Sequence, residues 1–292
     1  MVTHLKKRKY LNFLNHISIS KKLSLFLVIP LATLLFFAAS SVSDKQQQLT
    51  GTENTLHFSI IVNQLSELIH QLQKERGLSA GAHGSKGKIY LETLVQQRKR
   101  TDSVTHDLLS LLGNEPSYVT VSLREKLSHL TTELSGLNPL RLQIDQHTTH
   151  SFFDSYSHII NDIINVISFM PSLNSTYELN NLSSSYIELL WLEEYSGQER
   201  GALNGVFSEQ QFTAEQFSAV SSYISGQDAA IRNFNNTATQ QHQQHLMDAL
   251  SHSSNTNVEH FREVVLNRAL RQDALNGLQE SIGYGGLIHN FK

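Results

Sequence analysis

Hydrophobic residues recur along most of the chain at alternating steps of three and four positions. In residues 58–72 these positions are Phe58, Ile61, Leu65, Leu68 and Leu72. In residues 153–170 they are Phe153, Tyr156, Ile160, Ile163, Ile167 and Met170. Such spacing puts the side chains on one face of an α-helix and is typical of the seam of an antiparallel bundle or coiled coil. The pattern predicts an all-α fold of long up-and-down helices.

The remaining sequence predicts further helices, separated by breaks rich in glycine, proline and asparagine. These helices are expected at about 88–113, 117–136, 176–206, 209–234, 236–252 and 256–281. The breaks are expected at 84–87, 113–116, 136–139, 170–171 and 251–257. Residues 153–170 and 189–192 are the strongest candidates for the core.

One segment near the start of the chain has no polar face. Leu23–Val42 is a run of twenty residues without a charge, just long enough to span a hydrocarbon core of about 30 Å as a helix. The positive-inside rule places the start of the chain in the cytoplasm and everything after Val42 outside. The basic residues before the run are Lys6, Lys7, Arg8, Lys9, Lys21 and Lys22. A cleaved signal peptide is the alternative, with a weak site at Ala38–Ser40, but the length and position of the run favour an uncleaved anchor.

The apolar run and the helical region together predict how the chain is divided into domains. We expect a basic cytoplasmic N-terminus at 1–22, a transmembrane helix at 23–43 and an exported all-helical domain at 44–281. Residues 282–292 are expected to be the start of a C-terminal continuation that the chain lacks. No second apolar run is long enough to span a membrane. A cytoplasmic signalling domain is therefore expected to be missing or separate.

Composition and charge remove several classes of function. The formal net charge of −3 gives no electrostatic support for bulk binding of nucleic acid. The absence of cysteine excludes disulfides, thiol nucleophiles and thiolate metal sites. No nucleophile elbow, phosphate loop or pair of catalytic carboxylates occurs, so we expect neither an enzyme nor a cofactor. The histidine pairs His147/His150 and His242/His245 lie in polar surroundings, which indicates solvated side chains and no metal site.

A short phrase occurs twice in the exported region. Residues 75–81 read Glu-Arg-Gly-Leu-Ser-Ala-Gly, and residues 199–205 read Glu-Arg-Gly-Ala-Leu-Asn-Gly. Because Arg76 continues the apolar seam of the first helix, we expect it on the inner face. Arg200 falls on a less regular stripe: Leu182, Tyr186, Leu189, Glu193, Ser196, Arg200, Leu203 and Phe207. An inward arginine is costly unless a carboxylate or an anion pairs with it, so two facing arginines suit a receptor for a small anion.

Each copy of the phrase also carries two glycines one helical turn apart. They are Gly77 and Gly81 in the first copy, and Gly201 and Gly205 in the second. A glycine inside a helix is tolerated where another group approaches closely or a ligand needs room. The alternative is that the first helix simply ends there, with Gly81 or Gly84 at its C-terminus.

Longer strings around the two phrases resemble the nitrate- and nitrite-sensing domain found in bacterial chemoreceptors, nucleotide cyclases, histidine kinases and antiterminators. These strings are LIHQLQKERGLSAG at 68–81, EYSGQERGALNG at 194–205 and VEHFREVVL at 258–266. The resemblance implies an all-helical fold over about residues 55–280, with a small oxyanion held between helices by arginines. It implies Arg76 and Arg200 as ligand-binding residues and, less securely because Arg268 and Arg271 lie close by, Arg262. It also implies a homodimer in the bacterial inner membrane with a periplasmic sensor.

The chemistry of the ligand agrees with these arginines. Nitrate is a planar, weakly hydrated monoanion, and the guanidinium fork matches its paired oxygens. Glu75 and Glu199 are expected either to balance the charge of an empty site or to hold the guanidinium groups in place. An anion that bridges helices favours one helix arrangement, and a shift of the first helix would carry the signal to the membrane. The alternatives are a membrane-tethered scaffold whose arginines form structural ion pairs, and a sensor of another small anion such as a carboxylate.

Overall fold

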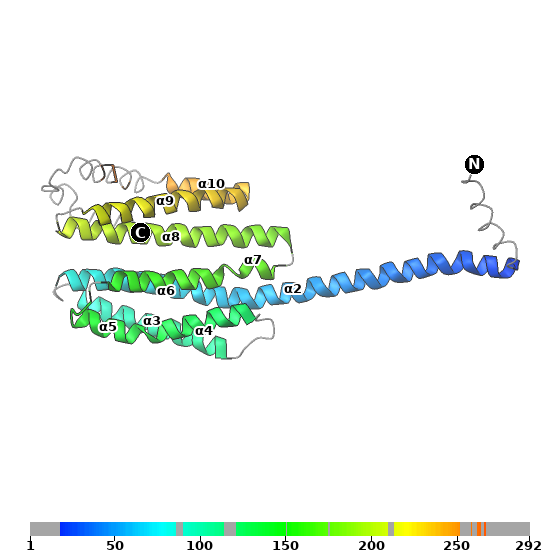
Figure 1. Cartoon of the computed structure of the whole chain (residues 1–292), viewed down its shortest axis with the longest axis horizontal. Coiled ribbons are helices and arrows are strands. Elements are labelled where there is room, and N and C mark those ends of the chain that lie inside the picture. Colours follow the sequence, from blue (N-terminus) through cyan, green and yellow to red (C-terminus); the bar gives the residue numbers. More distant parts are fainter. Residues whose placement is uncertain are drawn as a thin grey trace, which may run out of the picture. The chain divides into compact units, whose positions relative to one another are not determined.

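The computed structural model describes residues 18–85, 90–113, 121–149, 151–174, 176–209 and 213–251, with the helical positions 258, 262, 263 and 266. Every regular element in these residues is an α-helix (Figure 1), which confirms the predicted all-α fold. Contacts divide the chain into two compact units, Met1–Glu53 and Asn54–Lys292. The predicted continuation at 282–292, most of the predicted helix at 256–281 and the first basic residues lie outside the described residues.

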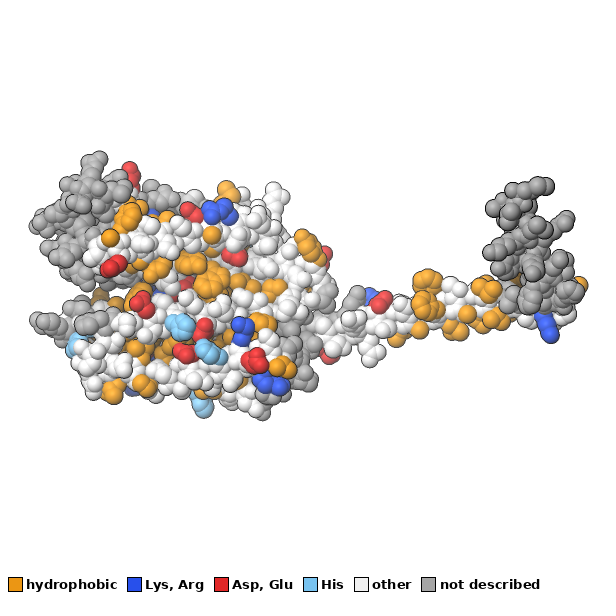
Figure 2. Space-filling view, viewed as in Figure 1, with side chains coloured by type: hydrophobic (Ala, Val, Ile, Leu, Met, Phe, Trp, Pro, Cys, Tyr) orange, Lys and Arg blue, Asp and Glu red, His pale blue; other side chains and the backbone are white. Residues whose placement is uncertain are grey.

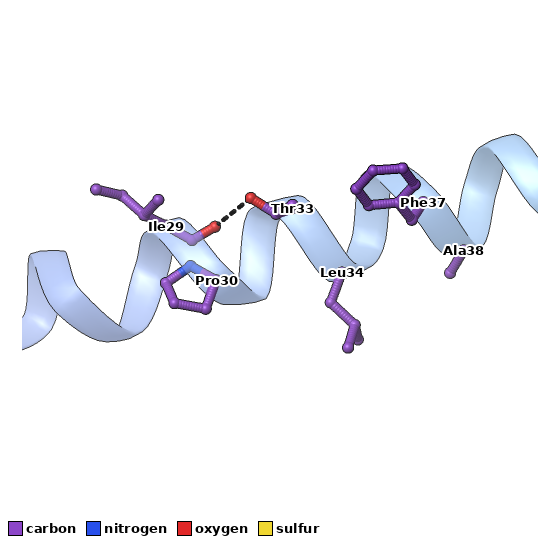
Figure 3. A pocket seen from close by; sticks show the side chains of 6 residues that line it. All are labelled: Ile29, Pro30, Thr33, Leu34, Phe37 and Ala38. Carbon is purple, nitrogen blue, oxygen red and sulfur yellow. Dashed lines mark hydrogen bonds between the residues drawn. The ribbon is translucent and has the colours of Figure 1, made fainter.

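The N-terminal unit contains the beginning of helix α2, which runs from Ile19 to Gly84. Its apolar segment is fully exposed, with Phe26 at 81% and Phe36 at 70%, and Figure 2 shows hydrophobic side chains along this surface. By length and composition α2 is able to cross a membrane, as no other helix of the described residues is. A shallow apolar pocket on this segment (Figure 3) is lined by Ile29, Pro30, Thr33, Leu34, Phe37 and Ala38.

The larger unit follows the predicted helices closely, with two short additional helices, Leu137–Asp145 and Met170–Leu173. The helices are α3 (Leu91–Gly113), α4 (Val121–Ser135), α5 (Leu137–Asp145), α6 (Phe152–Ile167), α7 (Met170–Leu173), α8 (Tyr177–Glu209), α9 (Ala214–Thr237) and α10 (Gln240–Leu250). The break expected at 136–139 is confirmed at Gly136, between α4 and α5, but it is shorter than expected: Pro139 lies in the first turn of α5, where proline removes no helical hydrogen bond. The break expected at 170–171 is wrong, because both residues lie in α7 and Pro171 is tolerated at the start of that helix. The break expected at 84–87 agrees with the end of α2 at Gly84.

The seams predicted from the apolar spacing form the core. In α2 the seam from Phe58 to Leu72 is buried, and it continues through Arg76 at 2% exposure and Ser79 at 0%. In α6 the seam is completely buried from Tyr156 to Ile167, while the predicted end positions Phe153 and Met170 are partly buried against it. The core predictions for these helices are therefore confirmed.

The predicted stripe of α8 is wrong in its first half, although its later position Leu203 is buried as expected. Leu182 is 48% exposed and the Glu193 side chain 54% exposed, although both were expected to face inward. The buried positions along the described part of this helix are Ser183, Ser185, Ile187, Leu190, Glu194, Gln198, Glu199 and Leu203. α8 lies beside α9 and also contacts α6 and α7 (Figure 1), so it presents more than one face to its neighbours. A helix covered from several sides has no single apolar stripe to reveal its inner face.

Candidate anion-binding site

Arg76 lies at the inner end of the α2 seam and makes an ion pair with Glu194 of α8. Its Nη1 donates to Oε1 of Glu194 at 2.5 Å and its Nη2 to Oε2 at 3.2 Å. Nη1 also donates to the Ser157 hydroxyl of α6 at 2.6 Å. The Arg76 and Glu194 side chains are 2% and 0% exposed, respectively. Arg76 therefore joins three helices that are far apart in the sequence.

Close packing fixes the position of this guanidinium group. The Phe153 ring lies 4.6 Å from its central carbon, a cation–π distance. On the side of α8, a Cβ added at Gly197 would lie 2.9 Å from Nη2 of Arg76. The guanidinium group therefore packs against the Phe153 ring and against the backbone of α8 at Gly197, which has no side chain.

Arg200 lies on the same helix as Glu194 and close enough to Arg76 for their charges to interact. Burial lowers the pKa of Arg200, and the positive charge of Arg76 lowers it further. The negative charges of Glu193 and Glu194 act in the opposite direction. The two arginines of the repeated phrases therefore share one electrostatic environment.

Glu75 is held by groups other than its neighbour Arg76. Nε and Nη2 of Arg141, on α5, donate to its two carboxylate oxygens at 2.7 and 2.9 Å, and the Tyr156 hydroxyl donates at 2.6 Å. Burial acts to raise the pKa of Glu75, but the hydrogen bonds and charge of Arg141 outweigh burial, and the net pKa is lowered. Glu75 therefore holds the guanidinium of Arg141, whereas the sequence suggested that of Arg76.

Glu199 has an analogous arrangement in the second half of the domain. Nε and Nη2 of Arg262 donate to its two oxygens, each at 2.5 Å, and Nε2 of Gln227 donates at 2.7 Å. Arg262 follows Glu199 by 63 positions, and Arg141 follows Glu75 by 66. The repeated phrase is thus part of a repeated structure, in which its glutamate binds an arginine from a later helix. This contact places Arg262 on Glu199, and the ligand contact that the resemblance implies for Arg262 stays a prediction.

The glycines of the phrases have different surroundings. A Cβ at Gly201 would overlap the Phe153 ring, and one at Gly81 would lie 2.7 Å from the Tyr90 ring, so both allow close approach. Gly77 has nothing within 4 Å of a Cβ, so no group approaches it closely, and room for a ligand stays the other predicted reason for this glycine. Gly81 lies inside α2, so the helix does not end at that residue. Gly205 lies inside α8.

Sequence reasoning missed several members of this site. Glu194 was assigned no role because the stripe of α8 was placed one position away from it. The spacing Ile187, Leu190, Glu194 would have revealed it as a charge on an inner face. Ser157, Gly197, Arg141 and Gln227 gave no comparable pattern. Among the described residues, no group of three or more acidic or histidine side chains is placed to hold a metal ion.

The chain is similar to a known protein family and to a solved structure. A family described as nitrate and nitrite sensing matches residues 67–283, which is more than half of the chain. No curated protein sequence matches the chain. Among solved structures, that of the NasR transcription antiterminator is similar, with a TM-score of 0.70 and 18% identity over 89% of this chain and 73% of that one. At this identity the likeness concerns the fold alone.

Proposed function

Because the chain belongs to the nitrate and nitrite sensing family, we propose that it senses nitrate or nitrite by binding the anion between α2 and α8 through Arg76 and Arg200. The observation that carries this proposal is the buried Arg76 at the junction of α2, α6 and α8, close enough to Arg200 of α8 for their charges to interact. Guanidinium groups donate paired hydrogen bonds that suit a planar oxyanion.

The proposed route of the signal is helix α2. This single helix carries both the apolar segment Leu23–Val42 and Arg76. An anion that binds one arrangement of α2 and α8 better than another shifts the population by that difference in affinity. A small displacement of α2 would then act on the membrane segment.

We further propose the setting in which the sensor works. The basic residues before Leu23 favour a cytoplasmic N-terminus in a bacterial inner membrane, with the sensor in the periplasm. The receptor is proposed to be a homodimer that passes its signal to a cytoplasmic signalling domain. Nitrate sensing does not require an enzyme activity, a cofactor or nucleic acid.

The second candidate function is a membrane-tethered scaffold with structural arginines. It is favoured by the observation that Arg76, Arg141 and Arg262 each bind a buried carboxylate. Buried pairs of this kind occur in proteins without any ligand. A sensor of a small carboxylate is a variant of the first proposal, since the Arg76 guanidinium already accepts a carboxylate partner.

Thermal unfolding of the full chain in detergent separates these functions. The anions to compare are nitrate, nitrite, chloride, sulfate and citrate. A ligand that binds the folded state raises the melting temperature, and the stabilisation grows with the logarithm of its concentration over Kd. Nitrate or nitrite stabilisation that is lost in Arg200→Gln supports the proposal. A response to citrate alone favours the carboxylate sensor, and no response to any anion favours the scaffold.

A further inference from the structure

Glu194 is a buried carboxylate in the middle of the proposed binding site. Its exposure is 0%, and it accepts hydrogen bonds from both terminal nitrogens of Arg76. Nε2 of Gln73 donates to it at 3.0 Å and Nε2 of Gln198 at 2.8 Å. Its two oxygens face the guanidinium as those of a planar oxyanion would. An anion that binds Arg76 must therefore share this guanidinium with Glu194 or displace it.

The charges around Glu194 restrict what else the site accepts. Arg76 contributes a buried positive charge and Glu194 a buried negative charge, and the positive charge of Arg200 lies close by. Gln73 and Gln198 are neutral donors to Glu194, while the Ser157 hydroxyl accepts from Arg76 and donates to the Phe153 carbonyl. Glu193 and Asp154 carry charges nearby, but both are exposed and screened by water. The buried negative charge of Glu194 repels a bound dianion about twice as strongly as a monoanion, which disfavours the dianion.

We propose that Glu194 determines the selectivity of the site, because its carboxylate competes for Arg76 and limits binding to monoanions. This inference rests on the proposed function of Arg76 and Arg200. According to this inference, Glu194 lowers the affinity for nitrate and increases the selectivity of the site against sulfate and phosphate. A purely structural Glu194 would hold Arg76 in place without changing the ratio of the two affinities.

The test is calorimetric titration of the full chain in detergent with sodium nitrate and with sodium sulfate. Glu194→Gln keeps the size of the side chain and removes its charge. We expect its nitrate Kd to fall by about tenfold or more and sulfate binding to become measurable. Glu178→Gln is the control, because it removes an exposed carboxylate from the first turn of the same helix, and we expect its affinities to stay as in the wild type.

A second variant separates charge from hydrogen-bond geometry. Glu194→Asp keeps the charge but shortens the side chain, so its contact with Arg76 is weaker. We expect tighter nitrate binding with sulfate still excluded. If Glu194→Gln does not fold, Glu194→Asp alone tests the inference.

The outcomes decide the inference in each case. If folded Glu194→Gln binds nitrate no more tightly than the wild type, or still excludes sulfate, the proposed role of Glu194 is wrong. The proposed function of Arg76 and Arg200 is not affected by that outcome. Sulfate binding by Glu194→Asp, or an equal effect of Glu178→Gln, overturns the proposed role of Glu194 as well. A wild-type chain that does not bind nitrate contradicts the proposed function and this inference together.

Discussion

The guanidinium group of Arg76 and the carboxylate of Glu194 form a buried ion pair across 118 positions of the chain. The pair joins α2 to α8, the two helices that carry the repeated phrase. It keeps each buried charge compensated without a bound anion. It also places the proposed ligand contact at the junction between the halves of the domain.

The first prediction concerns the loss of Arg76. Arg76→Ala leaves Glu194 buried without its cation, and we expect a loss of about 3–5 kcal/mol in the free energy of unfolding. Nitrate stabilisation should disappear in the same variant. Chemical denaturation with and without nitrate measures both effects. The control is Arg100→Ala on the exposed face of α3, which we expect to change neither. Full stability of Arg76→Ala would contradict the ion pair.

The second prediction concerns the pH dependence of stability through Glu75. Burial acts to raise the pKa of this group, but Arg141 and Tyr156 lower it below its ordinary value. The stability that ionised Glu75 contributes is therefore present above its unfolded pKa of about 4.3 and is lost as the pH falls through the lower folded pKa. Denaturation curves between about pH 7 and pH 3 should show this loss in the wild type.

In Glu75→Gln the acid-dependent part of the stability loss should shrink, although the variant is less stable at neutral pH. Glu92→Gln, at an exposed position of α3, is the control and should retain the wild-type slope. An unchanged slope in Glu75→Gln would show that another group causes the acid sensitivity.

The third prediction compares two glycines that the repeated phrase makes equivalent. Gly77 is exposed in the interior of α2 with open space around it, so Gly77→Ala should stabilise by about 0.5–1 kcal/mol. Gly201→Ala should destabilise because its Cβ would overlap the Phe153 ring that covers Arg76. Melting temperatures that move in the same direction would contradict this difference.

The fourth prediction concerns Arg262 and Glu199. If Arg262 acts by holding Glu199, a double-mutant cycle with Arg262→Ala and Glu199→Ala should give a coupling of about 0.5–3 kcal/mol. Nitrate affinity should fall less in Arg262→Ala than in Arg200→Gln. Additive effects on stability, with complete loss of nitrate binding in Arg262→Ala, would favour a direct contact with the anion.

The sequence predicted much of the fold because the apolar spacing in α2 and α6 is regular. Arg76 was correctly expected on the inner face because it continues an unbroken seam. The same reasoning failed on α8, where neighbours on several sides bury polar residues such as Ser183 and Gln198 and leave Leu182 exposed. Periodicity identifies an inner face only where one face alone is covered.

The ion-pair partners of the buried charged residues could not be predicted from the sequence. Glu75 and Arg76 are adjacent in the chain, but adjacent side chains on a helix point in different directions. Glu75 therefore meets Arg141, and Arg76 meets Glu194. Pairings of this kind depend on the lateral order of the helices, which no local pattern encodes.

The central claim is that Arg76 and Arg200 together hold nitrate or nitrite. Arg200→Gln tests it more directly than a change at Arg76, because the ion pair between Arg76 and Glu194 remains intact. The measurement is calorimetric titration of nitrate and nitrite into the full chain and into this variant. We predict saturable binding of at least one of these anions to the wild type and its loss in a folded Arg200→Gln. Equal binding by both proteins, or no binding of either anion by the wild type, would contradict the claim.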